Sequence, residues 1–376
     1  MHLQAETISQ SRRGHDSAGS TINAPAPQPR PGPRVLMLVE CSAGGTGRHV
    51  LDLAQGLIER HCDVHLIYST RRTDKMFLDR LIGIQSLSKT VIPMRTAPHP
   101  SDLRAVRSIR RYMAANGPFD IIHGHSSKGG ALARLAAFAT RTPAVYTLHG
   151  LIMMDPGLPR WKWMLYLSIE LALSLRTSRI IAVSPEEMRA AKRLGLGERR
   201  VILAPNGVGP QNLTSRQEAR KTLGVGEDAL VIGFVGRLVE QKAPEILIRA
   251  VAATLKAAPH VRLAVVGAGP LENAMRELAG TLGIGDKIIW LGERDAREVM
   301  SAFDLFALSS RKEGLPYVVL EAMAAGLPVV ATSSAGVESL IDPGVNGAVV
   351  RPDDAKAFGD ALIELATNPS RLAASG

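Results

Sequence analysis

Two cations in the second half of the chain have the residue types and the spacing to bind a phosphate group. Arg237 directly follows the apolar run 229–236, and Lys242 comes five residues later, just before a predicted helix that begins near Pro244. Arginine offers a planar fork to phosphate oxygens, and lysine offers a compact charge. Taken alone, the pair is equally well interpreted as two solvated surface cations.

The stretch 309–321 adds two carboxylates to these cations. Glu313 falls in a loop after an apolar strand, Gly314 allows close approach of the backbone, and Pro316 suits the first turn of a helix. The amino end of that helix would direct free amides at an anion. Glu321, one to two turns into the helix, could accept hydrogen bonds from paired hydroxyls such as those of a ribose. The alternative is a loop charge and a helix-surface charge.

A glycine-rich loop lies in the first half of the chain. The segment Ala43–His49, which contains Gly45, follows the first predicted strand and opens a helix. Small residues at this position let backbone amides approach a phosphate or a sugar. A dinucleotide site would need an acidic residue about twenty positions on, and none stands out. A plain tight turn is the alternative.

Two histidines and a lysine stand at predicted strand ends in the first half. His149 ends one strand and is followed by Gly150, which favours a functional role over a structural one. His125 and Lys128 follow the neighbouring strand. We regard both as candidates for the acceptor side of a site, with a structural role equally compatible.

The scaffold for these residues is predicted to be α/β, because short β-branched runs alternate with helical patterns twice along the chain. The first series begins at residue 34 and the second at residue 229. We predict a tail over 1–33 that is disordered, a Rossmann-like acceptor domain over 34–208 and a Rossmann-like nucleotide domain over 209–376. Ligands of such sheets bind outside the carboxyl ends of the strands, so the two domains should face each other across a cleft.

Composition narrows the choice of partners. The 376 residues carry a net charge of +10, and no apolar run is long enough for a membrane span. Residues 34–205 hold 25 Lys and Arg against 13 Asp and Glu, so the first domain carries the whole basic excess. Such an excess can serve nucleic acid, an anionic membrane or a phosphorylated substrate. The two cysteines do not form a disulfide framework, and we expect a cytoplasmic protein.

The quoted motifs resemble those of glycosyltransferase family 4, whose retaining enzymes have the fold called GT-B. The likeness covers about residues 34–365 and rests on two glutamates separated by seven residues, matched by Glu313 and Glu321, and on the cations Arg237 and Lys242. It implies a nucleoside-diphosphate sugar donor, no cofactor and no metal. The residues that it makes catalytic are His149, Arg237, Lys242 and Glu313. Those that it places at the donor are Gly45, Gly314, Leu315 and Glu321.

Two features depart from the family pattern. The glycine that often follows the lysine is Ala243 here, and the sequence ends at Gly376, before the long terminal helix that usually crosses back to the first domain. The first change hardly alters the charge argument. The second raises the alternative of a catalytically silent partner subunit.

The acceptor is predicted from basic and aromatic patches. A helix over 103–112 would place Arg104, Arg107 and Arg111 on one face, and residues 160–166 combine Trp161, Trp163 and Tyr166 with two cations. Both patches favour docking on an anionic bilayer, where a glycan or polyprenyl-phosphate-linked acceptor would lie. The alternative is a solvated helix face and ordinary core aromatics. The sequence is similar to bacterial enzymes that build surface polysaccharides, on the inner face of the cell membrane.

Two further classes of function are weighed against this one. A sugar-nucleotide epimerase of the same fold would need acid–base carboxylates near the sugar and no acceptor site. A nucleic-acid-binding protein is suggested by the basic charge alone, and the sequence contains no recognition motif for nucleic acid.

Overall fold

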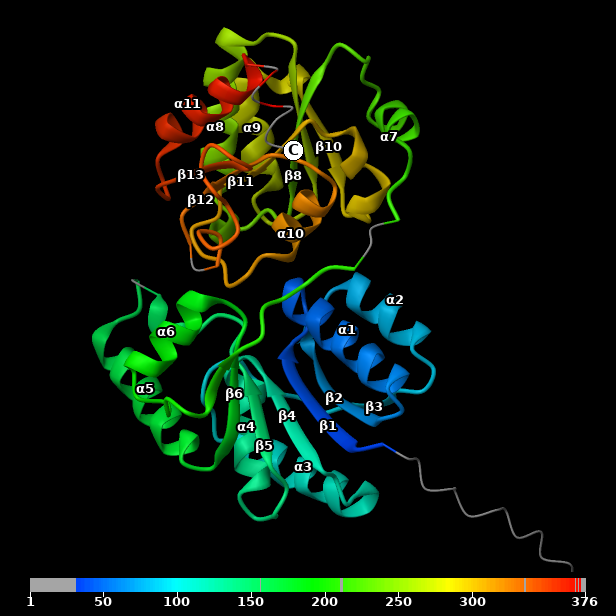
Figure 1. Ribbon diagram of the computed structural model, residues 1–376, viewed down its shortest axis with the longest axis vertical. Helices are drawn as coiled ribbons and strands as arrows, with labels where there is room; N and C mark the ends of the chain where they lie inside the picture. The colour runs from blue at the N-terminus through cyan, green and yellow to red at the C-terminus, as the bar shows by residue number, and fades with distance from the viewer. Residues whose placement is uncertain are drawn as a thin grey trace, which may run out of the picture.

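The computed structural model describes residues 32–155, 157–209, 212–334, 336–368, 370 and 372. The predicted disordered tail therefore lies outside the described residues, except for its last two positions. The described chain forms two lobes, each a parallel sheet with helices on both faces (Figure 1). This is the predicted α/β architecture.

The first sheet has seven parallel strands in the order β3-β2-β1-β4-β5-β6-β7. Its strands are β1 (Arg34–Cys41), β2 (Asp63–Arg72), β3 (Ser88–Val91), β4 (Ile121–His125), β5 (Ala144–Thr147), β6 (Thr177–Ala182) and β7 (Val201–Leu203). The helices of this lobe are α1 (Gly45–Glu59), α2 (Lys75–Gly83), α3 (Asp102–Asn116), α4 (Ser126–Ala137), α5 (Arg160–Ser174) and α6 (Pro185–Arg193). Central β1 is apolar and buried on both sides, as a strand covered by helices on both faces must be.

The second sheet has six parallel strands in the order β10-β9-β8-β11-β12-β13. Its strands are β8 (Leu230–Val235), β9 (Val261–Val266), β10 (Ile288–Gly292), β11 (Leu305–Leu308), β12 (Val329–Thr332) and β13 (Gly347–Val350). Its helices are α7 (Arg216–Leu223), α8 (Pro244–Ala257), α9 (Glu272–Thr281), α10 (Tyr317–Ala324) and α11 (Ala355–Ala366). In this core, position 233 of β8 has room only for a glycine. A Cβ on Gly233 would lie 2.1 Å from the ring of Phe303.

In both sheets the strand order reverses beside the first strand of the series, at β1 and at β8. Such reversals open a crevice at the carboxyl ends of the strands. The loops that follow β1, β5, β8 and β11, together with the amino end of α4 directly after β4, line one space between the lobes. The lobes are joined by the chain between β7 and α7 (Figure 1), and the boundary proposed after residue 208 falls in this segment. That boundary stays a prediction.

Candidate active site

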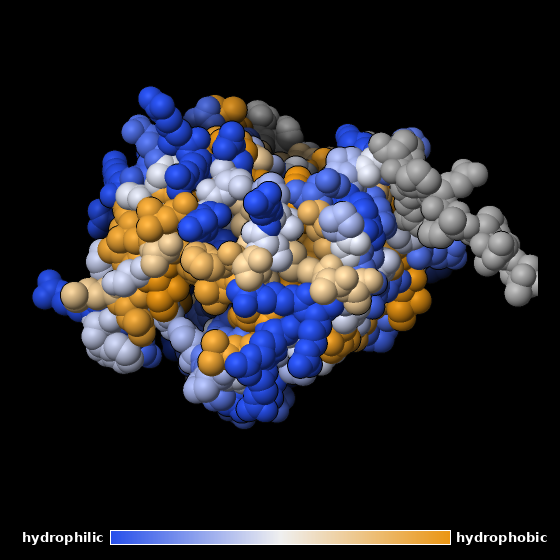
Figure 2. Space-filling model, turned by 90° about the horizontal axis from the view of Figure 1, so that it is seen from below, coloured by the Kyte–Doolittle hydropathy of each residue, from blue (hydrophilic) through white to orange (hydrophobic). Residues whose placement is uncertain are grey.

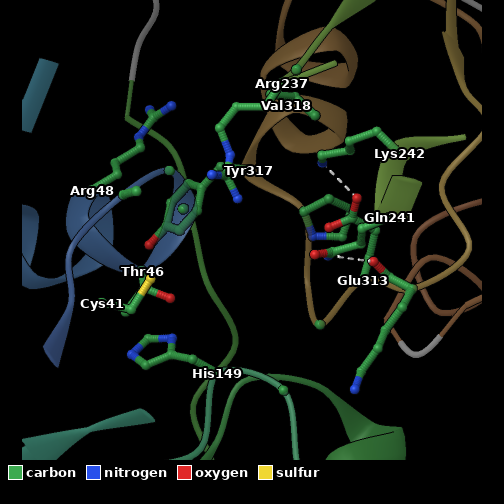
Figure 3. A pocket seen from close by; sticks show the side chains of 18 of the residues that line it. Cys41, Thr46, Arg48, His149, Arg237, Gln241, Lys242, Glu313, Tyr317 and Val318 are labelled. Carbon is green, nitrogen blue, oxygen red and sulfur yellow. Dashed lines mark hydrogen bonds and ion pairs between the residues drawn. The ribbon is translucent and has the colours of Figure 1, made fainter. Parts of the chain in front are cut away.

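The loops at the carboxyl ends of both sheets enclose a cavity of about 2100 Å³ between the two lobes (Figure 3). Nine of the ten sequence-predicted site residues line it: Gly45, Lys128, His149, Arg237, Lys242, Glu313, Gly314, Leu315 and Glu321. The tenth, His125, is fully buried and does not belong to the lining. The fold thus brings together residues that are up to 276 positions apart in the sequence.

The predicted cation pair lies after β8. The ammonium of Lys242 is 2.6 Å from a carboxylate oxygen of Glu313, and both side chains are largely shielded from solvent. Arg237 is exposed at the cavity wall, and no other residue that the structure describes forms an ion pair with its guanidinium. Figure 3 shows the side chain of Arg237 reaching into the same space as Lys242. An anion here would meet one free cation and one that is shared with a carboxylate.

Ala243 takes the left-handed backbone conformation, with φ of 44°. This conformation turns the chain from the Lys242 loop into α8, and a non-glycine residue in it costs roughly 1–2 kcal/mol. Ser309 stabilises the turn, because its hydroxyl donates to the carbonyls of Lys242 and Ala243. A glycine at this position would adopt the same conformation without that cost. Alanine in place of glycine at position 243 does not move Lys242 away from the cavity.

The second glutamate of the motif contacts the other lobe. Glu321 in α10 is buried and forms an ion pair with Arg48 of α1, whose guanidinium also lies 4.8 Å above the ring of Tyr317. A ribose hydroxyl at Glu321 would have to share the carboxylate with Arg48 or displace it. Neither Arg48 nor its neighbour His49 was predicted from the sequence. Their position in the first turn after the glycine-rich loop was the available signal.

Gly336 allows the loops around α10 to pack closely. A Cβ on Gly336, which has φ of 83°, would lie 1.9 Å from the carbonyl oxygen of Gly314. Gly314 in turn packs against the turn at His149 and Gly150 of the first lobe. A side chain at Gly336 would separate the two loops. The amino end of α10 is therefore brought to the cavity wall beside His149.

Lys128 has partners of its own, although it lines the cavity. Its ammonium lies 2.5 Å from a carboxylate oxygen of Asp102 and 2.9 Å from the carbonyl oxygen of Ala97. The side chain is buried. An acceptor group would have to compete with these contacts, so its acceptor role stays a prediction.

Four histidines form a cluster at the floor of the cavity. His149 lies edge-on to His49 of α1, with ring centroids 4.5 Å apart, and it stacks on buried His125. Beside them, His123 contacts the hydroxyl of Thr147 at 2.8 Å. Burial lowers the pKa of all four rings: that of His123 falls to about 3, and those of His125 and His149 fall well below their usual value. At neutral pH the cluster is therefore uncharged.

The buried histidines predict a stability that falls in acid. In the unfolded chain His123 titrates near pH 6.5, but in the folded protein it titrates near 3. Between these values the unfolded state binds the extra proton, so the free energy of unfolding decreases as pH falls, by about 1.4 kcal/mol per pH unit for one such group. Urea unfolding at pH 7 and pH 5.5 measures this loss. His123→Gln should make the dependence shallower, and an unchanged slope would contradict the assignment.

Comparison with known proteins identifies the family. A model described as Glycosyltransferase Family 4 matches residues 43–212, and one described as Glycosyl transferases group 1 matches residues 229–368. EpsD of Bacillus subtilis, named "putative glycosyltransferase", is 32% identical over 75% of this chain and 76% of its own length. The chain belongs to glycosyltransferase family 4. The D-inositol 3-phosphate glycosyltransferase of Stackebrandtia nassauensis is 31% identical over 88% of this chain and 81% of its own.

A solved structure confirms the fold of this family member. Anabaena HepE in complex with UDP and glucose superposes with a TM-score of 0.77, over 91% of this chain and 92% of its own, at 23% identity. Two parallel sheets that face each other across the cavity are thus the predicted GT-B fold. The protein is a glycosyltransferase.

Proposed function

We propose that this glycosyltransferase takes a sugar from a nucleoside-diphosphate donor and joins it, with retention of anomeric configuration, to a glycan or lipid-linked acceptor. The observation that carries the proposal is the convergence of Arg237, Lys242 and the amino end of α10 on one cavity that also holds Glu313 and Glu321. The Anabaena structure is a complex with UDP and glucose, which supports a donor of this class. The retaining outcome rests on the likeness to the family.

The chemistry requires a sugar–oxygen bond to break while negative charge builds up on the diphosphate. Fixed positive charge at the leaving group is the largest available contribution, because it needs no reorganisation during the reaction. Arg237, Lys242 and the free amides of α10 supply it. In this proposal Glu313 contacts the sugar, Glu321 the ribose, and His149 the sugar from the opposite lobe. Gly45, Gly314 and Leu315 form the backbone walls around the donor.

Thermal-shift measurements with a panel of nucleotide sugars test the proposal. A donor at about 100 times its Kd should stabilise the protein by roughly 2.7 kcal/mol. Incubation with the donor alone separates the alternatives: an epimerase converts the sugar without an acceptor, while a silent partner subunit neither hydrolyses nor transfers it. Absence of any shift across the panel would contradict the proposal. An inverted linkage in the product would contradict retention.

A membrane surface is the proposed source of the acceptor. One face of α5 exposes Trp161, Met164, Leu165 and Leu171, and Leu175 continues it at the C-cap; the small Ser168 is also exposed on this face. Arg160 and Arg176 are exposed at its two ends, whereas Trp163 and Tyr166 pack on the core. Tyr166 also lines the cavity, so α5 lies between the site and the solvent on this side of the lobe. Seen from below, the first lobe has apolar groups beside hydrophilic ones (Figure 2).

Such a helix is suited to lie in the plane of an anionic bilayer, with its apolar face in the lipid and its cations at the headgroups. The exposed Arg104, Arg107 and Arg111 of α3 add positive charge to the lower side of the same lobe. Among the described residues, no helix has the length and apolar character that crossing a membrane would require. The proposal is therefore peripheral attachment at the cytoplasmic face.

Sedimentation with lipid vesicles checks this attachment. We expect the protein to pellet with phosphatidylglycerol-containing vesicles at least ten times more strongly than with neutral ones, and salt should release it. The double variant Trp161→Glu/Leu175→Glu should stay in the supernatant. The matched control is Ile82→Glu, because Ile82 is equally exposed but lies on α2. Equal pelleting with both lipids, or equal loss in both variants, would refute membrane docking through α5.

A further inference from the structure

His125 ends β4 directly beside His149, which follows β5, and it has an unusual hydrogen-bonding state. Its ring is fully buried, and its Nδ1 lies 3.2 Å from Nε2 of His149. Its other nitrogen, Nε2, is buried without a hydrogen-bond partner among the described residues. The ring therefore has one polar contact, and that contact is with the histidine that borders the cavity.

This asymmetry determines which nitrogen of His125 carries the proton. A neutral imidazole has one N–H donor and one acceptor nitrogen. Burial keeps the ring neutral. A proton on Nε2 would leave a buried donor unsatisfied, which is rarer and costlier in proteins than an under-used acceptor. The proton therefore lies on Nδ1, from which it is donated to Nε2 of His149. His149 must then carry its own proton on Nδ1.

We propose that His125 is a positioning residue that fixes His149 in its Nδ1–H form, so that His149 offers a hydrogen-bond donor to an oxygen of the transferred sugar. The proposal rests on the proposed function for the identity of the sugar. The tautomer follows from the contacts alone. The ring of His149 also packs against the ring of His49. The backbone of His149 has a φ of 53°.

The remaining contacts of the cluster agree with this arrangement. His49 has its Nδ1 3.0 Å from Oδ1 of Asn206, an atom that can only accept, so this nitrogen is a donor. His123 contacts the hydroxyl of Thr147, which can serve as donor or acceptor. Neither ring offers His125 Nε2 a partner. His125 therefore exerts its effect on the cavity through His149.

A metal ion is the competing interpretation, because His49, His125 and His149 each present a ligand atom and these atoms lie within 4.8 Å of one another. Three histidines are a common donor set for Zn²⁺. An ion held by the two facing nitrogens would require lone pairs on both His125 Nδ1 and His149 Nε2. That arrangement moves the proton of His125 to its partnerless Nε2. The contacts therefore favour the hydrogen bond over the ion.

Two variants of His125 separate positioning from a merely structural role. In His125→Asn the side-chain amide lies near the position of Nδ1 and can still donate to His149. In His125→Gln the amide reaches toward the position of Nε2, where none of the described residues offers a partner. We expect His125→Asn to retain kcat within about threefold. His125→Gln should lose about 10–100-fold in kcat, the usual scale for losing a group that orients a functional histidine.

Nitrogen-15 NMR of histidine-labelled protein reads the tautomer without any assay of transfer, so it can fail or succeed independently of the proposed function. The His149 signals, assigned with His149→Gln, should report Nδ1–H in the wild type and in His125→Asn, and a mixture in His125→Gln. An Nε2–H form of His149 in the wild type would overturn the proposal, as would equal kcat losses in the two variants. Stoichiometric Zn²⁺ binding by the wild type, lost in His125→Asn, would overturn it in favour of a metal site.

Discussion

Lys242→Ala is expected to lower kcat by a factor of about 10²–10³, or roughly 2.7–4 kcal/mol of transition-state stabilisation. The ammonium lies at the carboxyl end of β8 and is shielded beside Glu313, where electrostatic interactions are stronger than in water. Its charge is needed most when the diphosphate leaves, so the loss should fall on kcat more than on KM. Steady-state kinetics with the donor identified by thermal shift measure both constants.

Arg237→Ala should give a loss of similar size, and comparison of the two variants is informative. Removal of Lys242 also leaves the carboxylate of Glu313 without its cation, whereas Arg237 has no such partner among the described residues. Arg237→Lys keeps the charge but loses the planar fork, and its kcat should lie between that of the wild type and that of Arg237→Ala. The control is Lys356→Ala on α11, an exposed lysine paired with Asp360. If all three alanine variants had wild-type kcat, the charge argument would be wrong.

Glu170→Ala is expected to lower the free energy of unfolding by about 3–5 kcal/mol. Glu170 in α5 accepts two hydrogen bonds, at 2.8 and 3.1 Å, from the guanidinium of Arg134 in α4. The Arg134 side chain is fully buried and lies over the ring of Tyr146. Without the carboxylate, an unpaired charge would remain inside the first lobe. Urea unfolding measures the change.

The exposed pair on α11 provides the control for this stability prediction. Asp360→Ala removes the partner of Lys356 at a similar ion-pair distance of 2.7 Å, but in solvent, and should cost less than about 0.5 kcal/mol. The double variant Glu170→Leu/Arg134→Met should recover much of the loss, because apolar replacement of a buried pair is often neutral. A loss below about 1 kcal/mol for Glu170→Ala would show that water reaches Arg134.

Local sequence signals were sufficient to predict most of the fold. The apolar runs beginning at residues 34 and 229 are the central strands β1 and β8, because strands buried on both faces need uninterrupted apolar residues. The helix predicted over 103–112 lies within α3, which spans 102–116. The loops chosen for chemistry follow strands, and parallel sheets bring the ends of such strands together. This is why nine chosen residues line one cavity.

The contacts between the lobes could not be predicted in this way. The pairing of Arg48 with Glu321 joins residues 273 positions apart, and no periodic pattern encodes such a distance. His125 illustrates the same limit: its place at a strand end predicted access to the site, but the ring lies beneath His149. Of the patch predicted over residues 160–166, Trp161 is exposed on α5, but Trp163 and Tyr166 pack on the core. Periodicity identifies an apolar stripe, but it cannot tell whether that stripe meets a core or solvent.

The central claim is that Arg237, Lys242 and the amino end of α10 bind the diphosphate of the donor. It is tested most directly by a crystal structure of the protein with the nucleoside diphosphate that gives the largest thermal shift. We predict diphosphate oxygens at about 2.7–3.2 Å from both cations, with the ribose hydroxyls at Glu321. A diphosphate bound elsewhere, with these three groups making no contact to it, would contradict the claim.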